Sequence, residues 1–253
     1  MICFLSNKNC YIIKNNSILK ILNGKRDVIL SLNNGDIISS KRSSIYFYEK
    51  DSFKIMKKIQ IGCFAKQIIE LKNKDILILS QHSELRLIKE NNAIADKISY
   101  PQNLKILSVI EIDNGKVAII SNNLNTEKTE IDYFDLNTKT LEQKILEDSY
   151  DINSKANSFI IKNNIYISFL NNLYIVDLTS QKKDKKELGF LKYYSFNDNI
   201  YGIKEKSIYN ITINNGEINT SKIYEENSDN ITCFIYTEDK KGIFCTNNKV
   251  GSF

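Results

Sequence analysis

One short pattern recurs along the whole chain and constrains its fold more than any other feature. At 32–49 the sequence is LNNGDIISSKRSSIYFYE: a turn rich in Asn and Gly, an apolar stretch, a polar tip and a second apolar stretch. Asn, Asp and Gly accept the positive φ that tight turns require, while Ile, Tyr and Phe favour strands, so the pattern predicts a β-hairpin. The same order occurs seven times, at 6–21, 32–49, 71–89, 112–135, 161–177, 196–211 and 237–253.

A further apolar stretch precedes most of these hairpins, so the repeated unit begins with three consecutive strands. The apolar residues form continuous runs instead of alternating strictly, which indicates strands that are covered on both faces. These first strands are expected at 28–32, 67–71, 106–112, 158–161 and 231–237.

A fourth segment of different composition follows the five central hairpins. Lys and Glu are mixed into it, as is typical of a strand at the exposed edge of a sheet, where charge deters unwanted pairing. These charged segments lie at 53–61, 93–100, 140–148, 182–190 and 217–226.

Three buried strands and one charged edge strand, recurring about every 40 residues, resemble the blades of WD40-like β-propellers. The resemblance is architectural, because the Gly-His and Trp-Asp signatures of that family are missing. Val176-Asp177 and Phe134-Asp135 stand where Trp-Asp would. The resemblance implies one all-β domain over residues 1–253, built of four-stranded antiparallel blades. A β-sandwich or a large barrel is the alternative, although neither requires a four-strand period.

The number of blades depends on the two ends of the chain. Seven hairpins favour seven blades, whereas the length favours six, and we expect seven with a ring that the chain termini close. Closure would bring Cys3, Cys10, Cys233 and Cys245 onto one or two neighbouring blades, with Cys63 apart. Plain thiols are expected, because stable disulfides are rare in the cytosol and no Cys-x-x-Cys spacing indicates zinc. Disulfides that latch the ring and a zinc site are the alternatives.

Composition and charge exclude several classes of protein. No apolar run of about 18 residues indicates a membrane helix, and the N-terminal residues do not form a signal peptide, so a cytoplasmic location is expected. The net charge of +5 is spread thinly, with one dense run at 182–186. Arg occurs only three times, which argues against a nucleic-acid reader, because such proteins use Arg to contact base edges.

No stretch of the sequence predicts a catalytic centre, a metal site or a cofactor. His82 is the only histidine, and no Gly-x-Ser-x-Gly turn or comparable nucleophile motif accompanies it. Asp36 and Asp75 occupy equivalent repeat positions, and paired carboxylates can perform acid–base chemistry in propeller glycosidases. Aspartate in a hairpin turn is, however, ordinary turn chemistry. The prediction is that the chain is not an enzyme and binds no small-molecule substrate.

The tips that join second to third strands are the candidate partner-binding sites. Varied residues at equivalent positions of a rigid scaffold suit recognition of proteins or peptides. We therefore expect a non-enzymatic interaction scaffold in a larger cytosolic assembly. A degenerate propeller hydrolase or a lectin-like domain that uses the central channel is the alternative. The candidate residues are Arg42, His82, Asn122, Asn171, Glu205 and Lys206.

Overall fold

The computed structural model is all-β, and the part of the chain that it describes contains strands and turns without a helix. Accordingly, no helix there is long and apolar enough to span a membrane. In strands at 2–11, 13–23, 142–149, 169, 214, 235–236, 245 and 250 only the backbone is described. The structure describes all residues except 1, 6–8, 15–16, 24–26, 91–94, 99, 101–102, 150–155, 170–171, 181, 191, 197, 215–216, 237–241 and 247–249.

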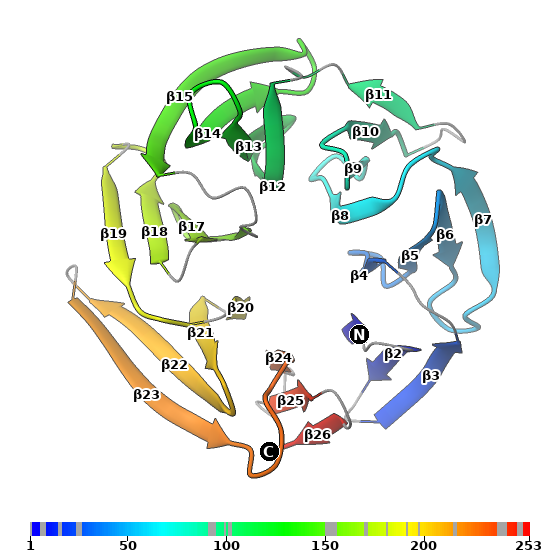
Figure 1. Ribbon diagram of the computed structural model, residues 1–253. Coiled ribbons are helices and arrows are strands. Elements are labelled where there is room, and N and C mark those ends of the chain that lie inside the picture. The colour runs from blue at the N-terminus through cyan, green and yellow to red at the C-terminus, as the bar shows by residue number, and fades with distance from the viewer. Residues whose placement is uncertain are drawn as a thin grey trace. The chain divides into compact units, whose positions relative to one another are not determined.

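The chain divides into two compact units, residues 1–153 and 154–253, and each is described by itself. The expected single domain over 1–253 therefore stays a prediction. Unit 1 contains three four-stranded sheets that follow a three-stranded one, and all neighbouring strands are antiparallel (Figure 1). Its strands are β1 (Ile2–Leu5), β2 (Asn9–Lys14), β3 (Ser17–Asn23), β4 (Ile29–Ser31), β5 (Ile37–Lys41), β6 (Ser44–Tyr48), β7 (Ile55–Gln60), β8 (Ala65–Glu70), β9 (Ile76–Ser80), β10 (Leu85–Ile88), β11 (Asp96–Ile98), β12 (Leu104–Asp113), β13 (Lys116–Asn123), β14 (Lys128–Asp135) and β15 (Thr140–Ser149).

Unit 2 repeats the same plan with two four-stranded sheets and a three-stranded sheet at the end of the chain. In every sheet the strands pair in chain order, as in a propeller blade. The strands of unit 2 are β16 (Asn157–Ile161), β17 (Asn164–Phe169), β18 (Asn172–Asp177), β19 (Lys183–Glu187), β20 (Lys192–Phe196), β21 (Asn199–Lys204), β22 (Ser207–Asn214), β23 (Glu217–Glu225), β24 (Cys233–Tyr236), β25 (Gly242–Cys245) and β26 (Val250–Ser252).

The charged segments occupy the sheet edges that the sequence predicts. The fourth strands β7, β11, β15, β19 and β23 each pair with one neighbour in their sheet (Figure 1). The second strands of the β4–β7 and β8–β11 sheets are more deeply buried than the third strands, and all five residues of β9 are buried. The first strands of successive blades contact one another within each unit, as β4 does β8 and as β16 does β20.

The predicted count of seven four-stranded blades is wrong. Among the described residues, five sheets have four strands, whereas the first (β1–β3) and the last (β24–β26) have three each. The physical reason is that the described strands at each end number three, so neither end sheet has the fourth, charged strand of the central sheets. Fewer than seven blades are therefore complete, which favours the six-blade alternative over seven. The structure does not show that the chain termini close the ring.

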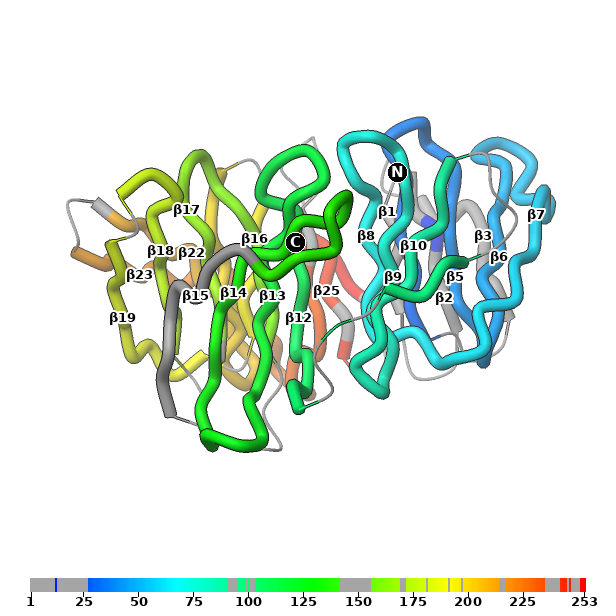
Figure 2. The backbone as a smooth tube through the Cα atoms, turned by 90° about the horizontal axis from the view of Figure 1, so that it is seen from above, coloured from blue at the N-terminus to red at the C-terminus, as the bar shows by residue number. Residues whose placement is uncertain are grey.

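The turns of each blade gather at its two ends, because successive strands run in opposite directions (Figure 2). The tips between second and third strands share one end with the links to the next blade. We call this end of the unit 1 blades the tip face. The turns between first and second strands share the other end with those between third and fourth strands, and we call this end the turn face.

A carboxylate from one blade binds the turn of the blade before it, and this contact occurs twice in unit 1. Glu70 at the end of β8 accepts a hydrogen bond from the backbone N–H of Asn33 at 2.6 Å. One blade further on, Glu111 of β12 accepts one from the N–H of Lys72 at 2.8 Å. Asn33 and Lys72 are equivalent turn residues, so the sequence repeat extends to the contacts between blades.

Candidate functional site

The tip around His82 is held rigidly by hydrogen bonds. The hydroxyl of buried Ser80, the last residue of β9, accepts from the backbone N–H of His82 at 3.2 Å and from that of Glu84 at 2.9 Å. The N–H of Gln81 donates to the carbonyl of Phe64 in the preceding link at 2.9 Å. His82 itself is exposed, so the fold presents its ring to solvent on a fixed backbone.

Arg42 occupies a two-residue hairpin turn between β5 and β6, where Lys41 pairs with Ser44. Its φ is 53°, in the left-handed region that tight hairpin turns need. The carbonyl of the next residue, Ser43, accepts from the N–H of Ile61 at 2.8 Å, which ties the tip to the following link. Arg42 is exposed and lies on the tip face with His82.

In unit 2 the turn of Glu205 and Lys206 repeats the geometry of the Arg42 turn. Glu205 has φ 52°, and Lys204 pairs with Ser207 across a two-residue turn. The carbonyl of Lys206 accepts from the N–H of Glu226 at 2.8 Å, as that of Ser43 accepts from the next link in unit 1. The Lys206 amine donates to the carbonyl of Asn227 at 3.4 Å.

The prediction that Asn122 is part of an exposed tip is wrong. Asn122 lies within β13, is fully buried, and its side-chain oxygen accepts from the hydroxyl of Thr129 at 2.8 Å. The reason is that β13 and β14 extend further than the apolar runs indicate, so the turn falls at 124–127. Asn171 lies outside the described residues.

Two exposed apolar side chains on the tip face were not predicted. Phe64, in the link between β7 and β8, is 45% exposed, and Leu124, at the tip between β13 and β14, is 47% exposed. Their backbones are fixed, because the N–H of Leu124 donates to the carbonyl of Asn103 at 2.9 Å and the carbonyl of Phe64 accepts from Gln81. The signal for Leu124 was an apolar residue between turn formers, as in NNLNT, whereas Phe64 in GCFAK follows a single turn former, Gly62.

Asp36 and Asp75 are engaged in their own blades. One oxygen of Asp36 accepts from the N–H of Lys50 at 3.1 Å and the other from the side chain of Asn34 at 2.8 Å. Asp75 accepts from the N–H of Glu90 and from the side chain of Asn73, both at 3.0 Å. Each carboxylate thus joins two turns of the turn face, which agrees with ordinary turn chemistry.

Asp135 and Asp177, the residues in the place of the Trp-Asp signature, also stabilise turns. Asp177 accepts from the N–H groups of Thr179 at 3.0 Å and Ser180 at 2.6 Å. Asp135 accepts from the N–H groups of Thr138 and Asn137, and these bonds lower the pKa of its carboxyl group. An aspartate at the end of the third strand therefore fixes the turn that leads into the charged edge strand.

The cysteine cluster expected from ring closure is not tested. The side chains of Cys3, Cys10 and Cys245 lie outside the described part of the structure. Cys63 is a buried free thiol, and burial raises its pKa against the opposing fields of Arg86 and Lys97. Within the described residues, no three His, Cys, Asp or Glu side chains are grouped so as to hold a metal ion.

The fold of the chain is that of known β-propellers. The WD40 β-propeller domain of Doa1 matches with a TM-score of 0.68 and 9% sequence identity, over 96% of this chain and 84% of that domain. BamB from Moraxella catarrhalis matches with a TM-score of 0.65 and 10% identity, over 99% and 92% of the two chains. Hydrazine synthase of Kuenenia stuttgartiensis matches with a TM-score of 0.70 and 9% sequence identity, over 97% of this chain and 88% of that chain. No protein-family model and no curated protein matches the sequence.

Proposed function

We propose that this chain is a non-enzymatic protein-interaction scaffold of a larger cytosolic assembly, and that a partner protein binds the tip face of unit 1. The observation that carries the proposal is the pair of exposed apolar side chains, Phe64 and Leu124, on the same face as Arg42 and His82. Apolar groups surrounded by polar and charged ones are the usual composition of an interface centre and its rim.

The rigidity of the tips supports this proposal. The hydrogen bonds that the Ser80 hydroxyl, the Phe64 carbonyl and the Asn103 carbonyl accept from backbone N–H groups fix these segments before any partner arrives. A surface that is ordered in advance loses little conformational entropy on binding. The similarity to other propellers is compatible with a scaffold role. It does not point to any particular reaction, because propellers serve many unrelated functions.

Affinity purification of the tagged chain from its native cells, with mass spectrometry of what co-purifies, tests the proposal. The double variant Phe64→Asp with Leu124→Asp should lose the partner, because two charges would have to be buried at the centre of the interface. Leu141→Asp on β15 is the matched control, since Leu141 is also 47% exposed but lies on an edge strand. A wild-type chain that purifies alone, or a double variant that retains every partner, would contradict the proposal.

A further inference from the structure

On the tip face, backbone hydrogen bonds join the segments of the β4–β7 and β8–β11 blades into one continuous surface. The carbonyl of Ser43 accepts from the N–H of Gly62 at 3.3 Å, so the tip that carries Arg42 lies against the link that carries Phe64. The carbonyl of Phe64 accepts at 2.9 Å from the N–H of the residue before His82. Phe64 therefore lies between the Arg42 tip and the His82 tip.

This part of the tip face is basic. Three basic residues and one acidic residue, Glu84, occur in its segments 41–44, 61–66 and 81–84. Asp27 is a further carboxylate at this end of the blades, because its N–H donates to the carbonyl of Ser40 at 3.1 Å. One oxygen of the Asp27 carboxylate is buried inside the protein. The positive charge thus exceeds the negative charge on the surface around Phe64.

The charge available to a partner is that of Arg42 and Lys41. The carboxylate of Glu84 is already engaged, because it accepts from Lys97 at 2.7 Å and from Arg86 at 3.1 Å. Arg42 is exposed and Lys41 is half-buried. Within the described part of the chain, neither of these two side chains has a hydrogen bond or an ion pair. An anionic group of a partner would therefore meet a guanidinium that no carboxylate of the protein neutralises.

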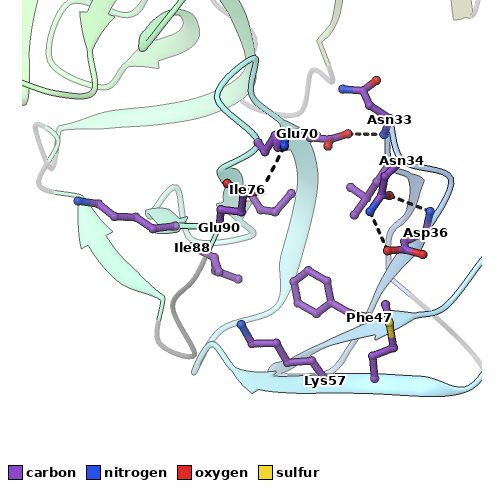
Figure 3. A pocket seen from close by; sticks show the side chains of 13 residues that line it. Asn33, Asn34, Asp36, Phe47, Lys57, Glu70, Ile76, Ile88 and Glu90 are labelled. Atoms are coloured by element: carbon purple, nitrogen blue, oxygen red, sulfur yellow. Dashed lines mark hydrogen bonds and ion pairs between the residues drawn. The ribbon is translucent and has the colours of Figure 1, made fainter.

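The turn face of the same two blades has no such surplus. A groove of about 480 Å³ opens there between the blades, and Phe47 and Ile76 are among its apolar lining residues (Figure 3). Its charged lining residues are three carboxylates and three lysines, Asp36, Glu70, Glu90, Lys57, Lys74 and Lys89. Because the two signs balance, this groove does not select a charged ligand.

The tip-face end of the β12–β15 blade is balanced as well. Among its described side chains, Lys105 and Lys128 stand against Glu127 and Glu130. Its contribution to an interface is the exposed apolar side chain of Leu124. The excess of positive charge is thus confined to the neighbourhood of Arg42, Phe64 and His82.

The composition of this surface favours an acidic protein over a nucleic acid. A nucleic acid is held by several cations that neutralise successive phosphates, whereas Arg42 and Lys41 are the two cations here without a partner among the described residues. The planar guanidinium of Arg matches a carboxylate through two parallel hydrogen bonds. Phe64, 45% exposed, provides the apolar contact that is typical of the centre of a protein interface.

We propose that the partner of the tip face presents an acidic segment with one large apolar side chain. The apolar side chain rests on Phe64, a carboxylate beside it pairs with Arg42, and the ring of His82 offers a hydrogen bond on the opposite side. This inference rests on the function proposed for the tip face and adds the chemical class of the partner.

A display library of random peptides, selected against the purified full-length chain, tests the inference. The enriched peptides should carry Asp or Glu beside one large apolar residue, and should shift the backbone amide NMR signals of Arg42, Phe64 and His82. Arg42→Glu should weaken their binding at least about tenfold, because like charges would then face each other. Arg42→Lys should retain part of the binding, since an ammonium group keeps the charge and lacks the planar fork. Lys54→Glu, the same charge reversal at an exposed position of the turn face, is the matched control and should leave binding unchanged.

Several results would overturn the proposal. These are a library without enrichment, enriched peptides without acidic residues, or equal binding of the peptides to the Arg42→Glu chain. Tighter binding of a single-stranded oligonucleotide than of the enriched peptides, in the same assay, would show that the ligand is a nucleic acid. A dimer in sedimentation that Arg42→Glu dissociates would show that a second copy covers the tip face.

Failure of this inference can be distinguished from failure of the proposed scaffold role. Enriched peptides that lack acidic residues but still shift the Phe64 signal would leave the tip face as a binding surface, and would overturn the acidic partner alone. Amide shifts confined to segments outside the tip face would contradict both.

Discussion

Glu70 of one blade accepts a 2.6 Å hydrogen bond from the backbone N–H of Asn33 in the blade before it. The Glu111–Lys72 pair repeats this relationship at 2.8 Å. The acceptor is charged, the donor is main chain, and the two residues lie far apart in sequence. In unit 1 this hydrogen bond joins the β4–β7 blade to the β8–β11 blade, and its counterpart joins the β8–β11 blade to the β12–β15 blade. It adds to the apolar packing between these blades.

Removal of these carboxylates should destabilise the chain measurably. We expect Glu70→Ala and Glu111→Ala each to lower the free energy of unfolding by about 1 kcal/mol, because a charge-assisted hydrogen bond is lost. Gln at either position should cost less, since its amide oxygen still accepts. Urea denaturation measures these differences. Glu90→Ala is the control and should cost only about 0.3 kcal/mol, because its ion pair with Lys74 is exposed. Equal losses of stability for Glu70→Ala and Glu90→Ala would contradict a stabilising role for the hydrogen bond between Glu70 and Asn33.

The two repeat aspartates should behave alike. Asp36→Ala and Asp75→Ala should each lower the free energy of unfolding by about 1 kcal/mol, because each carboxylate joins two turns of its blade. Asp51→Ala, at an exposed position of a neighbouring turn, serves as the control and should have little effect. Thermal unfolding of the three variants measures the difference. A neutral result for both repeat positions would disprove the structural role.

Stability should depend on the ionisation of Glu84. Hydrogen bonds from Lys97 at 2.7 Å and from Arg86 at 3.1 Å lower the pKa of its carboxyl group below the ordinary 4.5. A lowered pKa in the folded state stabilises the fold above pH 4.5, and this contribution is lost as the pH falls through the folded pKa. Glu84→Gln removes the titration.

Denaturation at a series of pH values therefore provides a test. The stability advantage of the wild type over Glu84→Gln should be constant near neutrality and should shrink below pH 4.5. In a Lys97→Met background the same comparison should show a smaller change, because the principal donor is gone. An advantage that does not vary with pH would show that the ion pairs contribute nothing.

Cys63 should be a slow nucleophile in the folded chain. Burial raises its pKa, so less thiolate is present at mildly alkaline pH than in the unfolded chain. Alkylation by iodoacetamide, followed by peptide mass analysis, should be at least about tenfold slower at Cys63 in the native protein than in urea. Equal alkylation rates in the native protein and in urea would show that the Cys63 thiol is accessible to the reagent, and would contradict its burial.

The strand order could be predicted from sequence because its signals are local. Ile-rich runs, Asn and Gly turns, and lysines on every fourth segment each depend on a few consecutive residues. Lys57 and Lys58 in β7, and the lysines of β19, mark edge strands for this reason. The number of blades could not be predicted, because each end of the sequence supplied three weak strand signals, which fit either six blades or seven.

The contacts between blades were harder to predict. Glu70 and Glu111 occupy equivalent positions in the QIIEL and SVIEI segments, which was a usable signal, but their partners lie in other repeats. Asn122 was misplaced because Asn is a turn former, and only the register of β13 with β14 shows that it lies inside the strands. The groove at Phe47 requires two blades to meet, so no single repeat predicts it.

Hydrogen–deuterium exchange of the chain, alone and with the protein that co-purifies with it, tests the scaffold proposal most directly. The account predicts that the partner slows exchange at the tip-face segments 61–64, 81–84 and 124–127, which contain Phe64, His82 and Leu124. Protection confined to other segments, or no protection by any co-purifying protein, would contradict it.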